Sequence, residues 1–155
     1  DELILLPANG GGSAKSLQVM DDDVPSATAG DRVGLALRNA KEEHLTGGTI
    51  IVHPAVEDKR TNTSVPLAVE QHVNSAVELS VSPFQKRALA VGDVIHASVD
   101  LQFVVGRVTA TEGSSMEVTW ESPLFIRKTN PPQVLIAQLD SKPRIMGSAT
   151  LEKQN

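Results

Sequence analysis

Cysteine is absent from this 155-residue chain, which excludes disulfides, thiolate catalysis and cysteine-ligated metal sites. The sequence also lacks any apolar run near the roughly 18 residues that a membrane-spanning helix needs, and it shows no signal peptide. A chain without cysteine suits a reducing compartment. We therefore predict a cytoplasmic protein that does not bind a membrane.

Excess positive charge is also missing, because the net charge is −5 and the isoelectric point is about 5.3. A protein that binds nucleic acid without specific positioning usually carries the opposite sign. The negative charge is concentrated in residues 1–60, which have 6 Lys/Arg and 10 Asp/Glu, whereas residues 61–155 have 8 and 9. The second part is nearly neutral, so it has room for a local basic patch.

Motifs for nucleotide binding are incomplete. The segment Asn9–Ser16 resembles a phosphate-binding loop, but Asn9 and Ala14 stand where that motif requires its two glycines. A strand rather than a helix is expected to follow, so no helix N-terminus would face an anion. We expect a flexible hairpin loop there.

Acidic residues and histidines do not form a metal or catalytic set. Asp21, Asp22 and Asp23 are consecutive, and consecutive strand residues point to opposite faces, so a solvated strand end before Pro25 is expected. No serine has an obvious histidine and aspartate partner. Four histidines lack metal-ligand spacing and are expected on the surface: His44, His53, His72 and His96. We predict no catalytic residue and no metal ligand.

What the sequence does contain is a hydrophobic period of two. Apolar and polar residues alternate over 33–38, 77–82 and 95–103, which is typical of half-buried strands. Glycine, asparagine and proline recur between these runs as turn signals. The pattern predicts an all-β fold of two small antiparallel β-barrels in tandem, with a single helical turn near Ala40–Leu45.

A polar segment without periodicity divides the chain. We predict a partial barrel over 1–54, a linker over 55–64 and a second barrel over 65–155. The chain opens on Asp1 rather than Met and continues directly into the strand-like Leu3–Leu6. We expect it to be a fragment whose upstream part has been removed.

The segment Ala29–Pro54, AGDRVGLALRNAKEEHLTGGTIIVHP, resembles the closing part of domain II in elongation factor Tu and its relatives. Asn39 and Gly47 depart from the family pattern, in which a glycine and an arginine stand there. Upstream, Lys15–Met20 is similar to a strand of the selenocysteine-specific branch. Arg144–Thr150 is similar to the segment that closes domain III. The positions that fit the first pattern are Ala29, Gly30, Asp31, Val33, Gly34, Leu37, Arg38, Gly48, Ile50, Ile51 and Pro54.

This resemblance implies a domain II barrel without its first strands, followed by a domain III barrel. In the family, an upstream GTPase domain binds and hydrolyses GTP, so GTP and Mg²⁺ are expected for that domain and no cofactor for this chain. The barrels bind the aminoacyl end and the T-arm of tRNA and dock on the ribosome. Aminoacyl-tRNA, the ribosome and the upstream domain are therefore the expected partners.

The resemblance also assigns candidate residues. Arg32 and Met20 stand where the family lines its aminoacyl pocket, although a histidine is usual at the position of Met20. Ser141 and Lys142 match the turn that approaches the T-stem backbone, and Arg144 follows them. We expect Lys142 and Arg144 to share one exposed face with some of Lys86, Arg87, Arg127 and Lys128.

Three functions remain open from the sequence. The first is the tRNA- and ribosome-binding part of a translational GTPase, without enzymatic activity of its own. The second is an interaction scaffold that kept the barrels but no longer carries tRNA, which Met20 and the acidic first part favour. The third is a free-standing enzyme, although no catalytic motif supports it.

Overall fold

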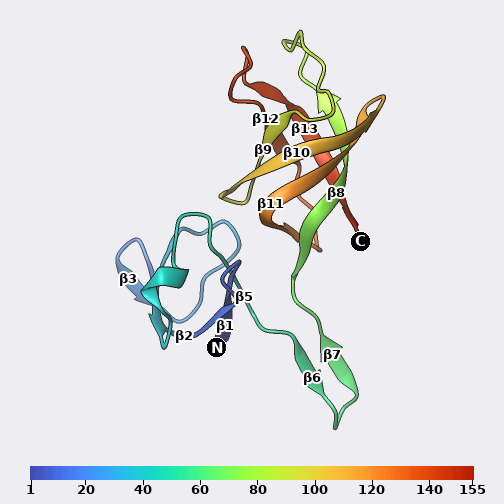
Figure 1. The fold of residues 1–155 in the computed structure, drawn as a ribbon. Helices are drawn as coiled ribbons and strands as arrows, with labels where there is room; N and C mark the ends of the chain where they lie inside the picture. Colours follow the sequence, from blue (N-terminus) through green and yellow to red (C-terminus); the bar gives the residue numbers. More distant parts are fainter. The chain divides into compact units, whose positions relative to one another are not determined.

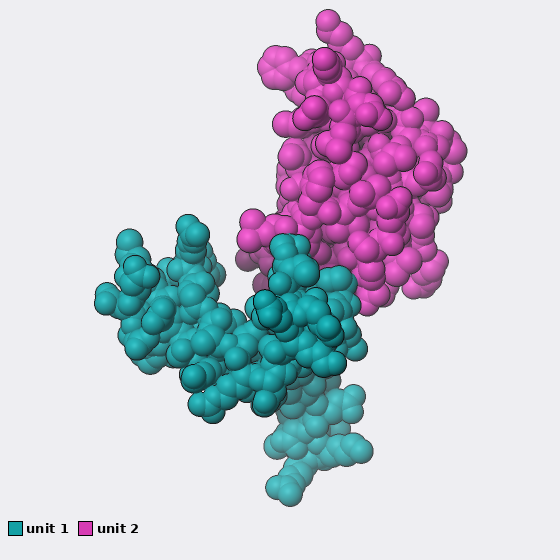
Figure 2. Space-filling view, turned by 60° about the vertical axis from the view of Figure 1, so that its left-hand side comes forward, with its two compact units in different colours: residues 1–67 teal, residues 68–155 magenta.

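The computed structural model describes all residues, Asp1–Asn155, and they form two compact units, Asp1–Leu67 and Ala68–Asn155 (Figures 1 and 2). The all-β class predicted from the alternation is confirmed. The one helical element is the 3-10 turn η1, Glu42–His44, as the sequence predicted for this segment. No helix is therefore long and apolar enough to cross a membrane.

Unit 1 is an open antiparallel sheet of five strands rather than a closed barrel. Its order is β3-β2-β1-β5, and β4 pairs with β2. Its buried hydrophobic side chains are Leu5, Leu6 and Val52, a small core for a unit of this length. The strands are β1 Glu2–Leu6, β2 Gly10–Val19, β3 Asp22–Val24, β4 Val33–Arg38 and β5 Ile50–Val52.

The glycine-rich segment is part of a strand, so the prediction of a flexible loop there is wrong. β2 begins at Gly10, and Gly11 and Gly12 pair with Ile4 and Leu3 of β1. A Cβ on Gly10 would lie 2.1 Å from the Nδ1 atom of His44. Glycine is needed here because η1 packs closely against the strand, not because the segment must be mobile.

The predicted linker 55–64 contains a two-stranded hairpin, β6 Val56–Asp58 and β7 Thr63–Val65. Its turn is closed by Asp58, whose Oδ1 accepts a 2.9 Å hydrogen bond from the Arg60 N–H. Every residue of both strands is exposed, so no apolar alternation marks them in the sequence. The division between the units falls at Leu67 and Ala68, a few residues after the expected start of the second barrel.

Unit 2 is a closed six-stranded barrel in the order β10-β11-β8-β13-β12-β9, with β9 pairing back to β10. Its core gathers inward side chains from every strand, including Val77, Ile95, Val118 and Met146. The strands are β8 Val69–Val81, β9 Val94–Val99, β10 Gln102–Glu112, β11 Ser115–Arg127, β12 Val134–Ala137 and β13 Ile145–Gln154.

Three buried side chains of the barrel are linked by polar contacts: His72, Ser75 and Trp120. Trp120 Nε1 donates a 2.8 Å hydrogen bond to Ser75 Oγ, which lies 2.7 Å from His72 Nδ1. His72 is 1% exposed, so the expectation that all four histidines lie on the surface is wrong for it. Burial lowers the pKa of His72; Lys153 lowers it further and Glu70 opposes the shift.

Candidate functional sites

The sheet of unit 1 brings the two aminoacyl-pocket candidates to adjacent positions. The β2–β4 ladder ends at the pair Val19 and Val33. Met20 and Arg32 are the next residues on these two segments, and both are exposed. Residues that are 12 positions apart in sequence therefore lie at the same end of one sheet because antiparallel pairing fixes their register.

Met20 occupies an unfavourable backbone conformation. Met20 and Asp21 form the two-residue turn between β2 and β3, with φ values of 52° and 68°. Two positive φ values in a two-residue hairpin define a type I′ turn, which strongly prefers Asn-Gly or Asp-Gly. The Met20 side chain is 92% exposed, so packing does not offset this cost. Such an outlier is a reason to look for a function at this turn.

Carboxylates surround the same end of the sheet. Asp21, Asp22 and Asp23 are all exposed, and Asp23 accepts a 2.9 Å hydrogen bond from Gln18 Nε2. Arg32 forms no ion pair with any of them. The site is therefore a single free guanidinium and an apolar side chain beside a group of negative charges.

Asp31 organises the turn that leads into Arg32. Its Oδ2 accepts hydrogen bonds from the N–H and the hydroxyl of Thr28, at 2.8 and 3.1 Å. These two bonds, the N–H first, hold the pKa of Asp31 below its usual value. The start of β4, and with it the backbone of Arg32, is thereby fixed.

The second group of candidates lies in the connection between β12 and β13. Gln138 N donates to the Arg144 carbonyl at 2.8 Å, and Ser141 N donates to the Gln138 carbonyl at 3.1 Å, which closes the connection on itself. Lys142 and Arg144 are exposed, whereas Ser141 is only 7% exposed. The two cations face solvent, whereas Ser141 is buried.

A residue that the sequence did not single out ties a second basic segment to this connection. The Gln85 side-chain amide donates to the carbonyl oxygens of Pro143 and Ile145, at 2.9 and 3.3 Å. Its Oε1 accepts from the N–H groups of Lys86 and Arg87, at 3.0 and 3.2 Å. One glutamine therefore brings two pairs of cations to the same end of the barrel. A lone polar residue carries no signal of this in sequence.

We call these four residues, Lys86, Arg87, Lys142 and Arg144, the basic end cluster. Arg87 forms an ion pair with Asp93 at 3.0 Å, and Asp140 is a further exposed carboxylate in the β12–β13 connection. The remaining three cations form no ion pair. Figure 1 shows the β8–β9 and β12–β13 connections leaving the barrel at this end.

Arg127 and Lys128 lie at the other end of the barrel. Arg127 pairs in register with Val69, at the start of the 13-residue strand β8, and Lys128 N donates to the Ala68 carbonyl. The Gln85 connection instead follows the last residue of β8. A strand of this length spans about 40 Å, so these cations do not join the cluster. Arg127 is also neutralised by Asp100 at 2.7 Å.

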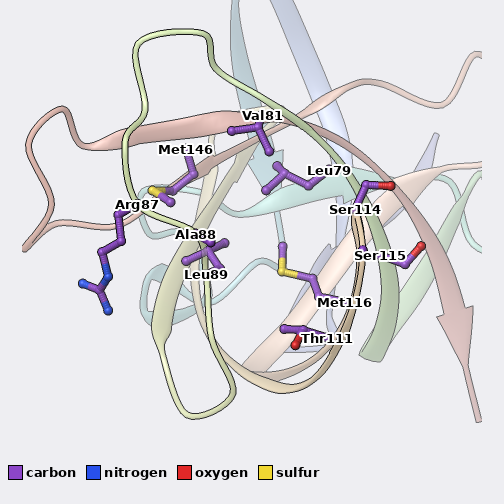
Figure 3. A pocket seen from close by; sticks show the side chains of 11 residues that line it. Leu79, Val81, Arg87, Ala88, Leu89, Thr111, Ser114, Ser115, Met116 and Met146 are labelled. Carbon is purple, nitrogen blue, oxygen red and sulfur yellow. The ribbon is translucent and has the colours of Figure 1, made fainter.

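A small cavity of about 90 Å³ opens beside the β8–β9 connection (Figure 3). Leu79, Leu89, Met116 and Met146 line it, and the Arg87 side chain points away from it. Ser114 and Ser115 at its rim both donate hydrogen bonds to Glu78, and no histidine lines the cavity. The cavity therefore brings no serine and histidine together. Nowhere in the chain do three or more His, Asp or Glu side chains come together to hold a metal.

Relatives in sequence are distant. No family model matches the chain. It is 29% identical over 104 residues to an uncharacterized protein of Methanocaldococcus jannaschii, covering 67% of this chain and 30% of that protein. It is 25% identical over 83 residues to elongation factor 1-alpha of Cenarchaeum symbiosum, covering 54% and 19%. The chain thus spans less than a third of the length of these relatives.

Solved structures match over almost the whole chain. The apo form of translation elongation factor SelB from Methanococcus maripaludis superposes with a TM-score of 0.72 at 22% identity, covering 100% of this chain and 36% of that one. Bacterial selenocysteine-specific elongation factor EF-Sec gives a TM-score of 0.73 at 16% identity, covering 97% and 22%. At the level of the fold, these matches confirm the resemblance that the motifs predicted. The chain has the fold of the part of SelB-type translation elongation factors that lies outside their GTP-binding domain.

Proposed function

We propose that this chain is the tRNA- and ribosome-binding portion of a GTP-dependent translation elongation factor. In this proposal unit 2 binds the phosphate backbone of the tRNA T-stem through Lys142 and Arg144. Unit 1 recognises the aminoacyl end through Arg32, with Met20 beside it. GTP and Mg²⁺ are bound by a GTPase domain upstream in the same protein, and one of the similar SelB structures holds the GTP analogue GppNHp.

The observation that carries the proposal is the basic end cluster in a chain whose net charge is −5. The β8–β9 and β12–β13 connections together carry these four cations and two carboxylates, Asp93 and Asp140, so the connections are positive while the chain as a whole is negative. Glu78 and Glu112 lie at the same end of the barrel, on the neighbouring strands. Phosphate contacts supply most of the affinity of proteins for nucleic acids. A negative chain that binds RNA needs such a local excess of positive charge.

The end of the sheet in unit 1 suits a different part of the ligand. Arg32 is a free guanidinium whose planar donors fit a carbonyl or phosphate oxygen. Met20 adds an apolar surface at the adjacent position. Together they can contact the ester-linked amino acid. Arg32 would bind the ester oxygens, and Met20 would contact the side chain of the amino acid.

A second function is favoured by one observation. Asp21, Asp22 and Asp23 are exposed beside Arg32 and Met20, and their charge repels a polynucleotide. An interaction scaffold that binds a basic protein through this end, and no tRNA, would place carboxylates and an exposed methionine there.

A salt titration of tRNA binding tests the two functions. Affinity of the chain for tRNA is measured at several salt concentrations, for the wild type, Lys142→Ala and Lys128→Ala. Each lysine that contacts a phosphate contributes about one unit to the slope of log affinity against log salt concentration. Lys142→Ala should therefore reduce the slope by about one.

Lys128→Ala is the matched control, because it removes the same charge from an exposed site at the other end of the barrel. It should leave the slope unchanged. Equal slopes for all three proteins would refute the T-stem assignment, and absence of tRNA binding at low salt would favour the scaffold.

A further inference from the structure

The chain has only three phenylalanines and one tryptophan. One of these few aromatic residues, Phe84, is exposed instead of packing in a core. Its side chain is 77% accessible to solvent, so it stabilises no core. It occupies the turn Ser82–Gln85, where Gln85 N donates to the Ser82 carbonyl at 3.0 Å. Ser82 Oγ also accepts from Phe84 N at 3.3 Å. The ring is thus held in water by a well-formed turn with Pro83 at its second position.

This turn is fastened to the segment that carries the T-stem candidates. Ser82 N donates to the Met146 carbonyl at 2.8 Å. The Gln85 amide donates to the Pro143 carbonyl, between Lys142 and Arg144. The backbone of Phe84 therefore stands beside the basic end cluster, with its position fixed from two sides.

The chemistry of this arrangement is that of single-stranded RNA recognition. An exposed ring offers a flat face on which a nucleobase stacks, and flanking cations bind the phosphates on either side of that base. A base within a duplex cannot be reached this way, because both of its faces are already stacked. The ligand chemistry is therefore an unpaired base next to a helical backbone.

The geometry points to Phe84 as a stacking contact for an unpaired RNA base, at a site built with Lys142 and Arg144. The inference rests on the proposed function and adds that the RNA bound at this end of the barrel has an unpaired base. A protein partner is the competing occupant, since Val81 and Ile145 are also partly exposed nearby. The excess of cations over carboxylates on the two connections that flank Phe84 favours RNA.

Two RNA ligands with the same base pairs test the site: a blunt-ended duplex, and that duplex with a single bulged uridine added to one strand. Binding of each to the chain is measured by fluorescence anisotropy for the wild type, Phe84→Ala, Phe84→Leu and Phe84→Tyr. Loss of a base–aromatic stack weakens binding by between about 5-fold and about 150-fold. We expect that loss for Phe84→Ala and Phe84→Leu with the bulged duplex alone.

Phe84→Tyr retains an aromatic face and should bind the bulged duplex like the wild type. Phe103→Leu is the matched control, because Phe103 is also exposed but lies on the outer face of β10, stacked on His96. Lys142→Ala should weaken binding to both RNAs, which tests the proposed function separately.

Binding of the bulged duplex that is equal for all Phe84 variants would overturn the stacking site and leave the phosphate site intact. If Phe84→Leu binds fully while Phe84→Ala loses binding, the contact needs only an apolar side chain, and base stacking on Phe84 is overturned. Failure of the wild type to bind either RNA would overturn both the site and the proposed function.

Discussion

Gln85 and Pro143 are 58 residues apart in sequence, yet the Gln85 side-chain amide donates a 2.9 Å hydrogen bond to the Pro143 carbonyl oxygen. The same side chain accepts from the N–H groups of Lys86 and Arg87. This single amide joins the β8–β9 connection to the β12–β13 connection. The basic end cluster depends on it.

Gln85→Ala should loosen both connections without unfolding the barrel, because Gln85 lies at the surface end of the core. Hydrogen exchange at the Lys86 and Arg87 amides should accelerate, since each loses a bond worth about 1 kcal/mol. The tRNA affinity should fall as the four cations separate. Gln133→Ala, at an exposed glutamine with no hydrogen-bond partner in the chain, should change neither quantity.

Arg32→Ala should discriminate between charged and uncharged tRNA. If Arg32 contacts the aminoacyl group, its loss weakens binding of aminoacyl-tRNA by about 1–3 kcal/mol, while uncharged tRNA binds nearly as before. The control is Arg38→Ala, which removes an exposed arginine at the opposite end of β4. Equal effects of Arg32→Ala on both tRNA forms would remove this residue from the aminoacyl site.

Two type I′ turns carry exposed hydrophobic residues at positive φ. Met20 is one, and Leu101, at φ 65° and 94% exposed, is the other. Asparagine tolerates this conformation better, so Met20→Asn and Leu101→Asn should each raise the free energy of unfolding by up to about 1 kcal/mol. Denaturant titration measures both. Only Met20→Asn should also alter binding of aminoacyl-tRNA.

The stability of unit 2 should depend on pH through His72. Its pKa is lowered in the folded barrel, chiefly by burial, so the unfolded chain binds the proton more readily. Stability is complete above the ordinary histidine pKa of about 6.5 and falls as the pH drops below it. His72→Asn should flatten this part of the profile, whereas His53→Asn, at an exposed site in unit 1, should leave it unchanged.

The chain itself should not bind GTP. The backbone amides of Gly10–Gly12 lie in the β1–β2 ladder and are not arranged around an anion. Titration calorimetry with GTP and Mg²⁺ should show no heat of binding. Micromolar affinity would contradict this prediction and would require a nucleotide site that the motif does not supply.

Period-two alternation identified the strand class because most strands bury one face only. It failed at Ile95–Phe103, which reads as a single strand but contains the end of β9, the turn Asp100–Leu101 and the start of β10. Because the chain reverses at this turn, the inward-pointing positions shift from odd-numbered residues such as Val99 to even-numbered residues such as Val104. No Gly or Asn marks this turn, so local sequence gave no signal for it.

The candidate site was predictable only where the motifs are local. Lys142 and Arg144 follow from a short segment near the end of the chain. Joining them to Lys86 and Arg87 requires the closure of the barrel and the reach of Gln85, which depend on long-range pairing. For the same reason, the burial of Ser141 and the separation of Arg127 from the cluster appear only in the folded chain.

The open sheet of unit 1 has a consequence for the behaviour of the chain in solution. β4 pairs only with β2, and β5 pairs only with β1, so each presents a row of unpaired N–H and C=O groups. The barrel of unit 2 has no such edge. Unpaired edges recruit strands from other molecules, and Ile51 and Val33 add exposed apolar surface to them. Self-association at high concentration should therefore begin at β4 or β5, and a charged or proline residue placed there should suppress it.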